Sequence, residues 1–180
     1  VLLLAAYDTA FDDGPLQSAH VAPIALVFLS NLLRPDAQET FRYFASQGVS
    51  VRVISGDNPI TVAQVAARAG IENADRYVDA TTLSTEQDFE EAVKYYTVFG
   101  RVTPEQKRYL VRAFQKQGHT VAMTGDGVND VLALKDANCG IAMASGSQAA
   151  SQVAQIVLLN SQFSAMPAIV AEGRRVINNI

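Results

Sequence analysis

The chain has 180 residues, of which 49% are hydrophobic, enough to fill the core of one domain of ordinary size. Its net charge is −4 and its 14 basic residues are scattered, which argues against nucleic-acid binding because that function usually needs a basic stripe. The single cysteine, Cys139, excludes an internal disulfide. No run reaches the ~18 apolar residues that a membrane-spanning helix needs, so we expect these residues to be soluble.

Apolar runs typical of strands alternate with helical patterns along the chain. The expected strands are Val1–Tyr7, Ala25–Leu29, Val49–Ile54, Val98–Phe99, Thr120–Met123, Cys139–Ala142 and Ile156–Leu158. The expected helices are Pro35–Gln47, Ile60–Ala69, Thr85–Tyr95, Pro104–Gln117, Asn129–Lys135, Gln148–Gln155 and Met166–Asn179. Strands that are apolar on both faces and separated by helices predict an α/β fold, a three-layer, Rossmann-like parallel sheet with helices on both faces.

Local signals mark several helix ends. The capping-box spacing, a Ser or Thr with Gln three residues later, occurs at Thr103 and Gln106 and again at Ser84 and Gln87. Three glycines follow expected helices, as glycines at helix C-termini do: Gly48, Gly70 and Gly118.

Two polar clusters directly follow expected strands, at Ser55–Asp57 and at Thr124–Asp126. Ligands of parallel sheets bind beyond the carboxyl ends of the strands, so we expect the two clusters to share one site. Two carboxylates about 4 Å apart repel by about 4 kcal/mol at an effective dielectric of about 20. We therefore expect Asp126 and Asp130 to hold a hard cation such as Mg²⁺. The alternative is a tight turn whose acids only cap a helix.

The order of the motifs resembles that of the P-type ATPases. The motifs that carry the resemblance are Ile54–Asn58, Arg101–Lys107, Thr124–Asp130, Gly140–Met143 and the tail Glu172–Ile180. The resemblance begins at about Pro23 and runs to the last residue. It implies a haloacid dehalogenase-like fold and an ATP-driven cation transporter as the parent protein, with Mg²⁺ and ATP as cofactors.

The resemblance also implies roles for individual residues. The expected catalytic residues are Lys107, Ser55, Asp126 and Asn129. The expected metal-binding residues are Asp126 and Asp130, with Asp130 and Asn129 also holding the loop. The expected cofactor-binding residues are Arg34, Gly56, Asp57, Thr124 and Gly125, of which Arg34 and Asp57 are expected to lie at the nucleotide.

The resemblance further implies a domain organisation. Residues 1–19 are the end of a nucleotide-binding domain and a linker, residues 20–165 are the C-terminal part of a phosphorylation domain, and residues 166–180 are a stalk segment toward the next membrane helix. We accordingly expect a piece of a longer membrane protein, lying on the cytoplasmic side. Its expected partners are ATP, the other domains of the same transporter and, through the membrane helices, the transported cation.

The nucleophile of the resembled family lies in the sequence Asp-Lys-Thr-Gly-Thr, which does not occur in these 180 residues. We therefore expect the piece alone to be inactive. In the resembled fold the nucleophile strand lies between the strands that end at Ser55 and Thr124. We expect the resulting slot to be filled by Val1–Tyr7, by a second copy of the chain, or by direct pairing of the two flanking strands.

Other interpretations stay open at this stage. The chain could be a soluble haloacid dehalogenase-like phosphatase, with Asp8 as its nucleophile, or a non-enzymatic nucleotide-binding module. The candidate residues also have structural readings: Lys107 as a solvated lysine, Ser55 as a turn residue, Arg34 as the partner of Asp36, and Asp57 as a helix N-cap.

Overall fold

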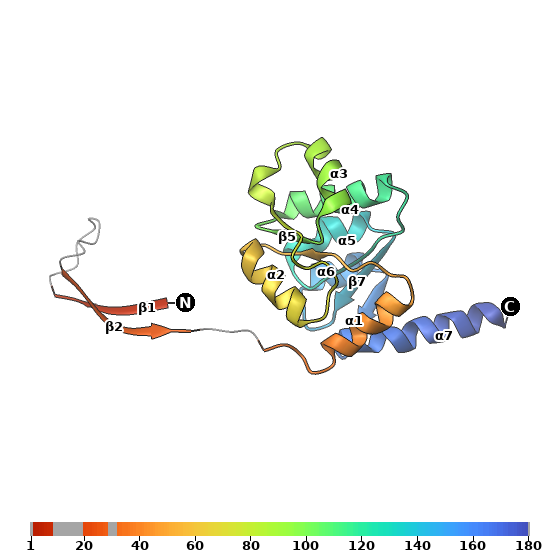
Figure 1. Cartoon of the computed structure of the whole chain (residues 1–180). Coiled ribbons are helices and arrows are strands. Elements are labelled where there is room, and N and C mark those ends of the chain that lie inside the picture. Colours follow the sequence, from red (N-terminus) through yellow and green to blue (C-terminus); the bar gives the residue numbers. More distant parts are fainter. Residues whose placement is uncertain (1, 9–19, 29–31, 180) are drawn as a thin grey trace. The chain divides into compact units, whose positions relative to one another are not determined.

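The computed structural model describes residues 2–8, 20–28 and 32–179 (Figure 1). The chain divides into two compact units, Val1–Leu32 and Leu33–Ile180. Residues 9–19, on which most of the expected linker falls, lie outside the described residues. The expected domain boundaries after residues 19 and 165 stay predictions. In the described part of the chain, no helix combines the length and apolar character needed to span a bilayer.

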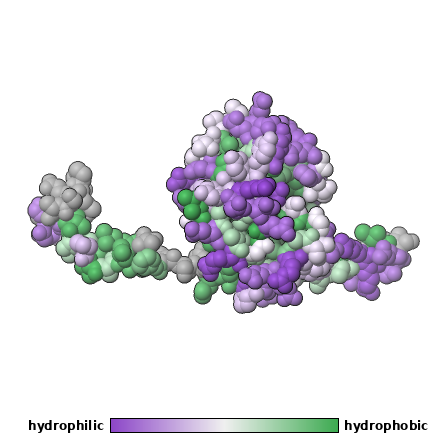
Figure 2. All heavy atoms as spheres, viewed as in Figure 1, coloured by the Kyte–Doolittle hydropathy of each residue, from purple (hydrophilic) through white to green (hydrophobic). Residues whose placement is uncertain are grey.

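The smaller unit holds two antiparallel strands, β1 (Leu2–Tyr7) and β2 (Val21–Val27). This antiparallel pair is separate from the parallel sheets that the sequence predicts. Parallel neighbours need a crossover, usually a helix, and the sequence contains no helical pattern between these two strands. Several apolar side chains on both strands are exposed, among them Leu3 at 57% and Leu26 at 58%, and Figure 2 shows this unit as largely hydrophobic.

The larger unit contains the remaining elements. Its strands are β3 (Val53–Ile54), β4 (Tyr77–Asp79), β5 (Val98–Gly100), β6 (Ala122–Gly125), β7 (Cys139–Met143) and β8 (Ile156–Leu158). Its α-helices are α1 (Ala37–Ser46), α2 (Pro59–Arg68), α3 (Glu86–Tyr95), α4 (Pro104–Lys116), α5 (Val131–Asp136), α6 (Gln148–Val153) and α7 (Met166–Asn178). Short 3₁₀ segments cover Ala80–Thr82, Val128–Asp130 and Phe163–Ala165. The strands form two parallel sheets, in the orders β3-β5-β4 and β6-β7-β8.

Helices cover both faces of each sheet, as the sequence predicts. In the first sheet, Val98 packs in a cluster with α2, whereas the next residue, Phe99, packs in a cluster with α3 and α4. In the second sheet, Ile141 packs with residues of α1 and α7, whereas Ala142 packs with residues of α4, α5 and α6. Successive side chains of a strand point to opposite faces, so each sheet is the middle of three layers.

The helix-end signals were mostly correct. Thr103 and Gln106 form the expected capping box of α4. The box of α3 lies one residue later than expected, because Thr85 rather than Ser84 is the N-cap and Asp88 closes the box. The three glycines expected at helix ends all adopt positive φ, with Gly48 at 73°, Gly70 at 82° and Gly118 at 85°.

Three strands differ clearly from the expectation. Strand β2 covers Val21–Val27 and so begins four residues before the expected Ala25–Leu29. Of the expected Val49–Ile54, only Val53–Ile54 pairs as a strand, because its partner β5 begins opposite Val53. Strand β4 was not expected, since it has only three residues, Tyr77–Asp79, and no apolar run marks it.

The sheet edges at β3 and β6 test one of the three ways to fill the expected central slot. Among the described residues, β3 and β6 do not pair with each other, so filling of the slot by direct pairing is wrong. Filling by Val1–Tyr7 or by a second copy of the chain stays a prediction.

Candidate functional site

The loops that follow β3 and β5 are joined at the start of α4. The carbonyl of Ser55 accepts a hydrogen bond from the amide of Val102 at 3.0 Å. Pro104 then begins α4, and the capping box of Thr103 sets its first turn. Lys107 lies in this first turn, so the short connection places it on the same edge of the molecule as Ser55.

Lys107 connects this edge to the loop after β6. Its Nζ lies 2.7 Å from Oδ1 of Asp130, and the two side chains are only 14% and 10% exposed. The other carboxylate oxygen of Asp130 accepts a hydrogen bond from the amide of Gly127 at 3.1 Å. The reading of Lys107 as a solvated lysine is therefore wrong. Asp130 holds the loop that carries Asp126.

Gly125 allows Asp130 to approach the end of β6. A Cβ added at Gly125 would lie 2.5 Å from Cβ of Asp130, a distance that real Cβ atoms essentially never show. The glycine is thus required by close packing rather than by a positive φ. Thr124, the residue before it, is exposed at the end of β6.

Asp126 is exposed, and its carboxylate makes no hydrogen bond to any described residue. Its backbone is held firmly, because its carbonyl accepts a hydrogen bond from the amide of Ser147 at 2.6 Å. Asn129 is also exposed, in the 3₁₀ segment that precedes α5. An oxygen-bearing carboxylate and amide therefore face solvent on a fixed backbone.

The loop after β3 orients Ser55 and Asp57. Oγ of Ser55 accepts a hydrogen bond from the amide of Asp57 at 3.1 Å. The carbonyl of Asp57 accepts one from the amide of Arg101 at 2.8 Å. Asn58, not Asp57, caps α2 by accepting a hydrogen bond from the amide of Ile60 at 3.0 Å. The N-cap reading of Asp57 is wrong, and both Gly56 and Asp57 are exposed.

The side chain of Arg34 makes a hydrogen bond to a residue far away in the chain. Its Nη1 donates a hydrogen bond to the carbonyl of Ser161 at 3.2 Å. Its expected structural partner, Asp36, makes no ion pair with it among the described residues. Arg34 thus reaches the segment after β8, and its predicted contact with ATP stays a prediction.

The carboxylate oxygens of Asp126 fit a magnesium ion that keeps several water molecules as ligands. Within the described residues, no group of three or more His, Cys, Asp or Glu side chains could hold a metal. Mg²⁺ is commonly bound by one or two carboxylates together with waters and phosphate oxygens, rather than by a complete protein cage. The exposed carboxylate of Asp126 meets that requirement.

One loop that contacts Asp126, Ala144–Ser147 after β7, was not among the predicted site residues. Gly146 packs against Asp126, and the amide of Ser147 donates to the Asp126 carbonyl. The signal was available, because a strand followed by small polar residues and glycine is the same pattern that identified Ser55–Asp57.

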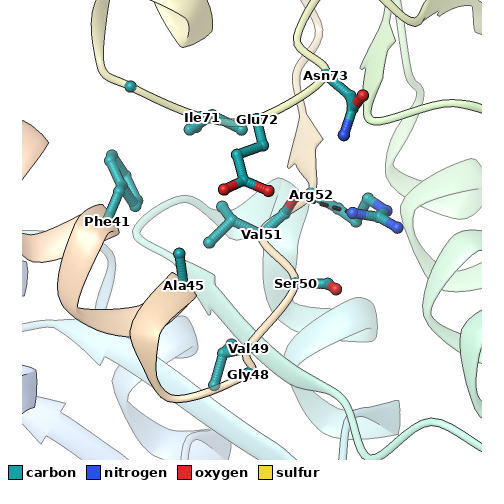
Figure 3. Close-up of a pocket in the computed structure, with 11 residues that line it drawn as sticks. Phe41, Ala45, Gly48, Val49, Ser50, Val51, Arg52, Ile71, Glu72 and Asn73 are labelled. Atoms are coloured by element: carbon teal, nitrogen blue, oxygen red, sulfur yellow. Dashed lines mark hydrogen bonds between the residues drawn. The ribbon is translucent and has the colours of Figure 1, made fainter.

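The cavity in Figure 3 lies elsewhere, at the opposite end of β3 from Ser55. It has a volume of about 260 Å³, and Gly48–Arg52, the segment that enters β3, forms one wall. Phe41 and Ala45 of α1 and Ile71 and Glu72 after α2 form others (Figure 3). No candidate catalytic residue lines it, so the cavity is not part of the candidate site.

Asp8, the alternative nucleophile, follows β1 in the smaller unit. Its carboxylate lies 2.8 Å from Nδ1 of His20. The pair closes the end of the two-stranded sheet, where the amide of Asp8 also donates to the carbonyl of His20 at 3.2 Å. These contacts give Asp8 a local structural role.

Curated relatives that resemble the whole chain are cation-transporting ATPases. The chain is 56% identical over 181 residues to the calcium-transporting ATPase CtpE of Mycobacterium tuberculosis, of which it covers 22%. It is 44% identical over 181 residues to a probable cation-transporting ATPase of Streptococcus pneumoniae, of which it covers 23%. The chain therefore spans about a fifth of the length of these relatives.

Solved structures with a similar fold come from the same kind of protein. A zinc-transporting PIB-type ATPase in the E2.Pi state matches 90% of this chain with a TM-score of 0.67 and 26% identity, and the match covers 22% of that chain. The catalytic domain of the CPx-ATPase CopB-B matches 78% of this chain and 46% of its own, with a TM-score of 0.61. At 22% identity, this second match supports the fold alone.

The family described as haloacid dehalogenase-like hydrolases matches residues 2–138, which is well over half of the chain. The parallel sheets flanked by helices agree with that match. The chain therefore belongs to the haloacid dehalogenase-like hydrolases.

Proposed function

We propose that this chain is part of the cytoplasmic phosphorylation domain of an ATP-driven, cation-transporting P-type ATPase, and that it binds Mg²⁺ and the aspartyl phosphate of that enzyme. The proposal is supported by the two ATPase relatives, which the chain resembles along its whole length. The ion named for one of them, calcium, is a first candidate for the transported cation.

The observation that carries the proposal is the hydrogen-bonded connection among Ser55, Lys107 and Asp126. Ser55 is joined to the start of α4, Lys107 in α4 is paired with Asp130, and Asp130 holds the amide next to Asp126. Three residue types that suit one small anion and its cation therefore share one edge of the fold. Had they lain on different sides of the unit, one shared site would be impossible.

Asp126 would be the carboxylate that holds Mg²⁺, with Asn129 beside it. Asp130 would act mainly by holding the loop, since its two oxygens already contact Lys107 and Gly127, and would reach the metal through water. Bound there, Mg²⁺ would neutralise charge on the phosphate oxygens.

Lys107 and Ser55 retain hydrogen-bond donors for a phosphate. An ammonium group has three donors, and Asp130 accepts from one of them, so two remain at Lys107. The hydroxyl oxygen of Ser55 accepts from the Asp57 amide, which leaves its own O–H free to donate. Donors held in place before the reaction stabilise the charge that develops during phosphoryl transfer.

Gly56, Asp57, Thr124 and Gly125 would bind the cofactors at the edge that carries Ser55 and Lys107, and Asp57 and Arg34 would reach the nucleotide. The γ-phosphoryl group of ATP would pass to an aspartate of the parent protein. That aspartate would lie outside these 180 residues, because they do not contain the Asp-Lys-Thr-Gly-Thr sequence. Positioning and charge stabilisation carry most of such a reaction, which is the role left to this chain. The 180 residues alone are expected to be inactive.

The decisive test is phosphoenzyme formation in the intact parent, measured with ATP labelled on its γ-phosphate. Asp126→Ala is expected to abolish the phosphoenzyme, and Lys107→Ala to slow its formation. Asp75→Asn, an exposed aspartate after α2, is the matched control and should leave it unchanged. A normal phosphoenzyme level in Asp126→Ala would overturn the proposal.

A further inference from the structure

The loop after β7 contacts the backbone of Asp126 at two adjacent residues. A Cβ added at Gly146 would lie 2.3 Å from the Asp126 carbonyl oxygen and 2.9 Å from its Cα. The next residue, Ser147, donates its amide to the same oxygen at 2.6 Å. Both contacts are made to the backbone, so they act on the direction in which the Asp126 side chain leaves the chain.

The same loop is anchored from its other side. The amide of Ser145 donates to Oγ of Ser161 at 2.9 Å, and the amide of Ala144 donates to the carbonyl of Leu158 at 3.0 Å. Ser161 adopts a φ of 52°, in the left-handed region that few non-glycine residues adopt. This backbone conformation is unfavourable for a serine. Ser161 adopts it while its hydroxyl accepts the hydrogen bond from the Ser145 amide, so the contact is kept in spite of the backbone strain.

Arg34 extends the connection to the start of the larger unit. Its guanidinium donates to the carbonyl of Ser161 at 3.2 Å, so it holds the backbone of the residue whose hydroxyl holds Ser145. The path Arg34–Ser161–Ser145 therefore leads, through Gly146 and Ser147, to Asp126.

We propose that the Ala144–Ser147 loop is a positioning element for Asp126, with Gly146 and Ser147 setting the Asp126 backbone and Ser161 and Arg34 anchoring the loop. This inference rests on the proposed role of Asp126 as a Mg²⁺ ligand. Residues that orient metal ligands without touching the metal typically change metal affinity by 10- to 100-fold when they are replaced.

Separate variants test the contact of Gly146 with Asp126 and the anchoring of the loop by Ser161. Gly146→Ala inserts a methyl group against the Asp126 carbonyl. Ser161→Gly removes only the hydroxyl acceptor, because glycine adopts positive φ without strain. Ser161→Asn restores an acceptor in a residue type that tolerates the left-handed region. Gly173→Ala is the matched control, because a Cβ at Gly173 has nothing within 4 Å.

Two measurements on the 180-residue chain test the proposal. The first is hydrogen exchange of the Ser147 amide by NMR without metal, which should be faster in Gly146→Ala and Ser161→Gly. The second is a Mg²⁺ titration followed at the Gly127 amide, in which both variants should bind about tenfold more weakly than the parent sequence. Ser161→Asn should recover both properties, and Gly173→Ala should match the unaltered chain.

The outcomes distinguish this inference from the proposed function. Unchanged Ser147 exchange in both variants, or unchanged Mg²⁺ affinity where the unaltered chain binds, would overturn the positioning role. If the unaltered chain shows no Mg²⁺ response at all, the metal role of Asp126 fails, while the metal-free exchange measurement still decides whether the loop is held as described. A drop in thermal stability without either change would mean a purely structural loop.

Discussion

Lys107 and Asp130 form an ion pair with little exposure to water, at 14% and 10%. Each charge depends on the other, because removing one partner of a buried pair leaves an uncompensated charge in a poorly solvated place. Asp130 also accepts a hydrogen bond from the amide of Gly127. Its carboxylate therefore connects α4, which carries Lys107, to the loop that carries Asp126.

We expect Asp130→Asn to lower the free energy of unfolding by about 3 kcal/mol, measured by urea denaturation, because Lys107 then remains buried without its counter-charge. Adding Lys107→Met should recover part of that loss, since the unpaired charge is gone. Glu91→Gln, which breaks the exposed pair with Lys94, is the control and should have little effect. Equal effects of Asp130→Asn and Glu91→Gln would contradict the buried-pair argument.

The sequence identified single residues as candidates but did not show which residues they contact. Lys107 and Asp130 were both selected as candidates, but each for a different role. Their pairing joins residues 23 positions apart in the chain, which no local pattern encodes. The local pattern of the Ala144–Ser147 loop was visible in the sequence, but the contact of Gly146 with Asp126 was not.

Helices α4 and α5 are joined by one carboxylate, that of Asp136 at the end of α5. Nε of Arg108 lies 2.7 Å and Nε of Arg112 2.6 Å from its Oδ2. Partial burial raises the pKa of Asp136, but the hydrogen bonds and charges of the two arginines outweigh it, and the pKa lies below its usual value. The ionised form is therefore favoured in the folded state.

The lowered pKa predicts the sign of the pH dependence. The contribution of Asp136 to stability is fully present above the pKa of an unfolded aspartate, about 3.9, and is lost as the pH falls through the lower folded pKa. We expect Asp136→Asn to lower the urea midpoint at pH 7 and to reduce the further loss of stability on going to acid. Asp75→Asn is the control. An unchanged acid dependence in Asp136→Asn would show that the carboxylate is not coupled to folding.

Elements whose signals are local were predicted well. The capping box of Thr103 and the three helix-ending glycines depend on residues within one turn of each other. Strand β4 was missed, and β3 was overestimated, because a strand becomes one only when a neighbour pairs with it. The antiparallel direction of β1 and β2 is likewise a property of their pairing rather than of either strand's own residues.

On the scale of the whole molecule, the two units differ in what stabilises them. Among the residues that the structure describes, the core clusters all lie within Leu33–Ile180. The smaller unit is a two-stranded sheet with exposed apolar side chains, and an isolated pair of strands is marginally stable at best in water. The larger unit should therefore account for the cooperative unfolding transition.

We expect a chain of residues 33–180 to keep the thermal midpoint of the full 180 residues, measured by circular dichroism. It should also aggregate less during size-exclusion chromatography, because the exposed leucines of β1 and β2 are gone. The full chain measured at the same concentration is the control. Loss of the cooperative transition in the shorter chain would mean that the smaller unit contributes to the core.

The alternation of strands and helices and the three-layer parallel architecture could be predicted from the sequence, which also supplied the candidate residues for a phosphate and a magnesium ion. These predictions depend on periodicity and on motifs a few residues long, whose physical causes act along the chain. The folded structure was needed to show that Lys107 is paired with Asp130, that Gly146 lies against Asp126, and that Arg34 reaches Ser161. Those contacts join segments far apart in the chain, and close packing in the folded state is what brings them together.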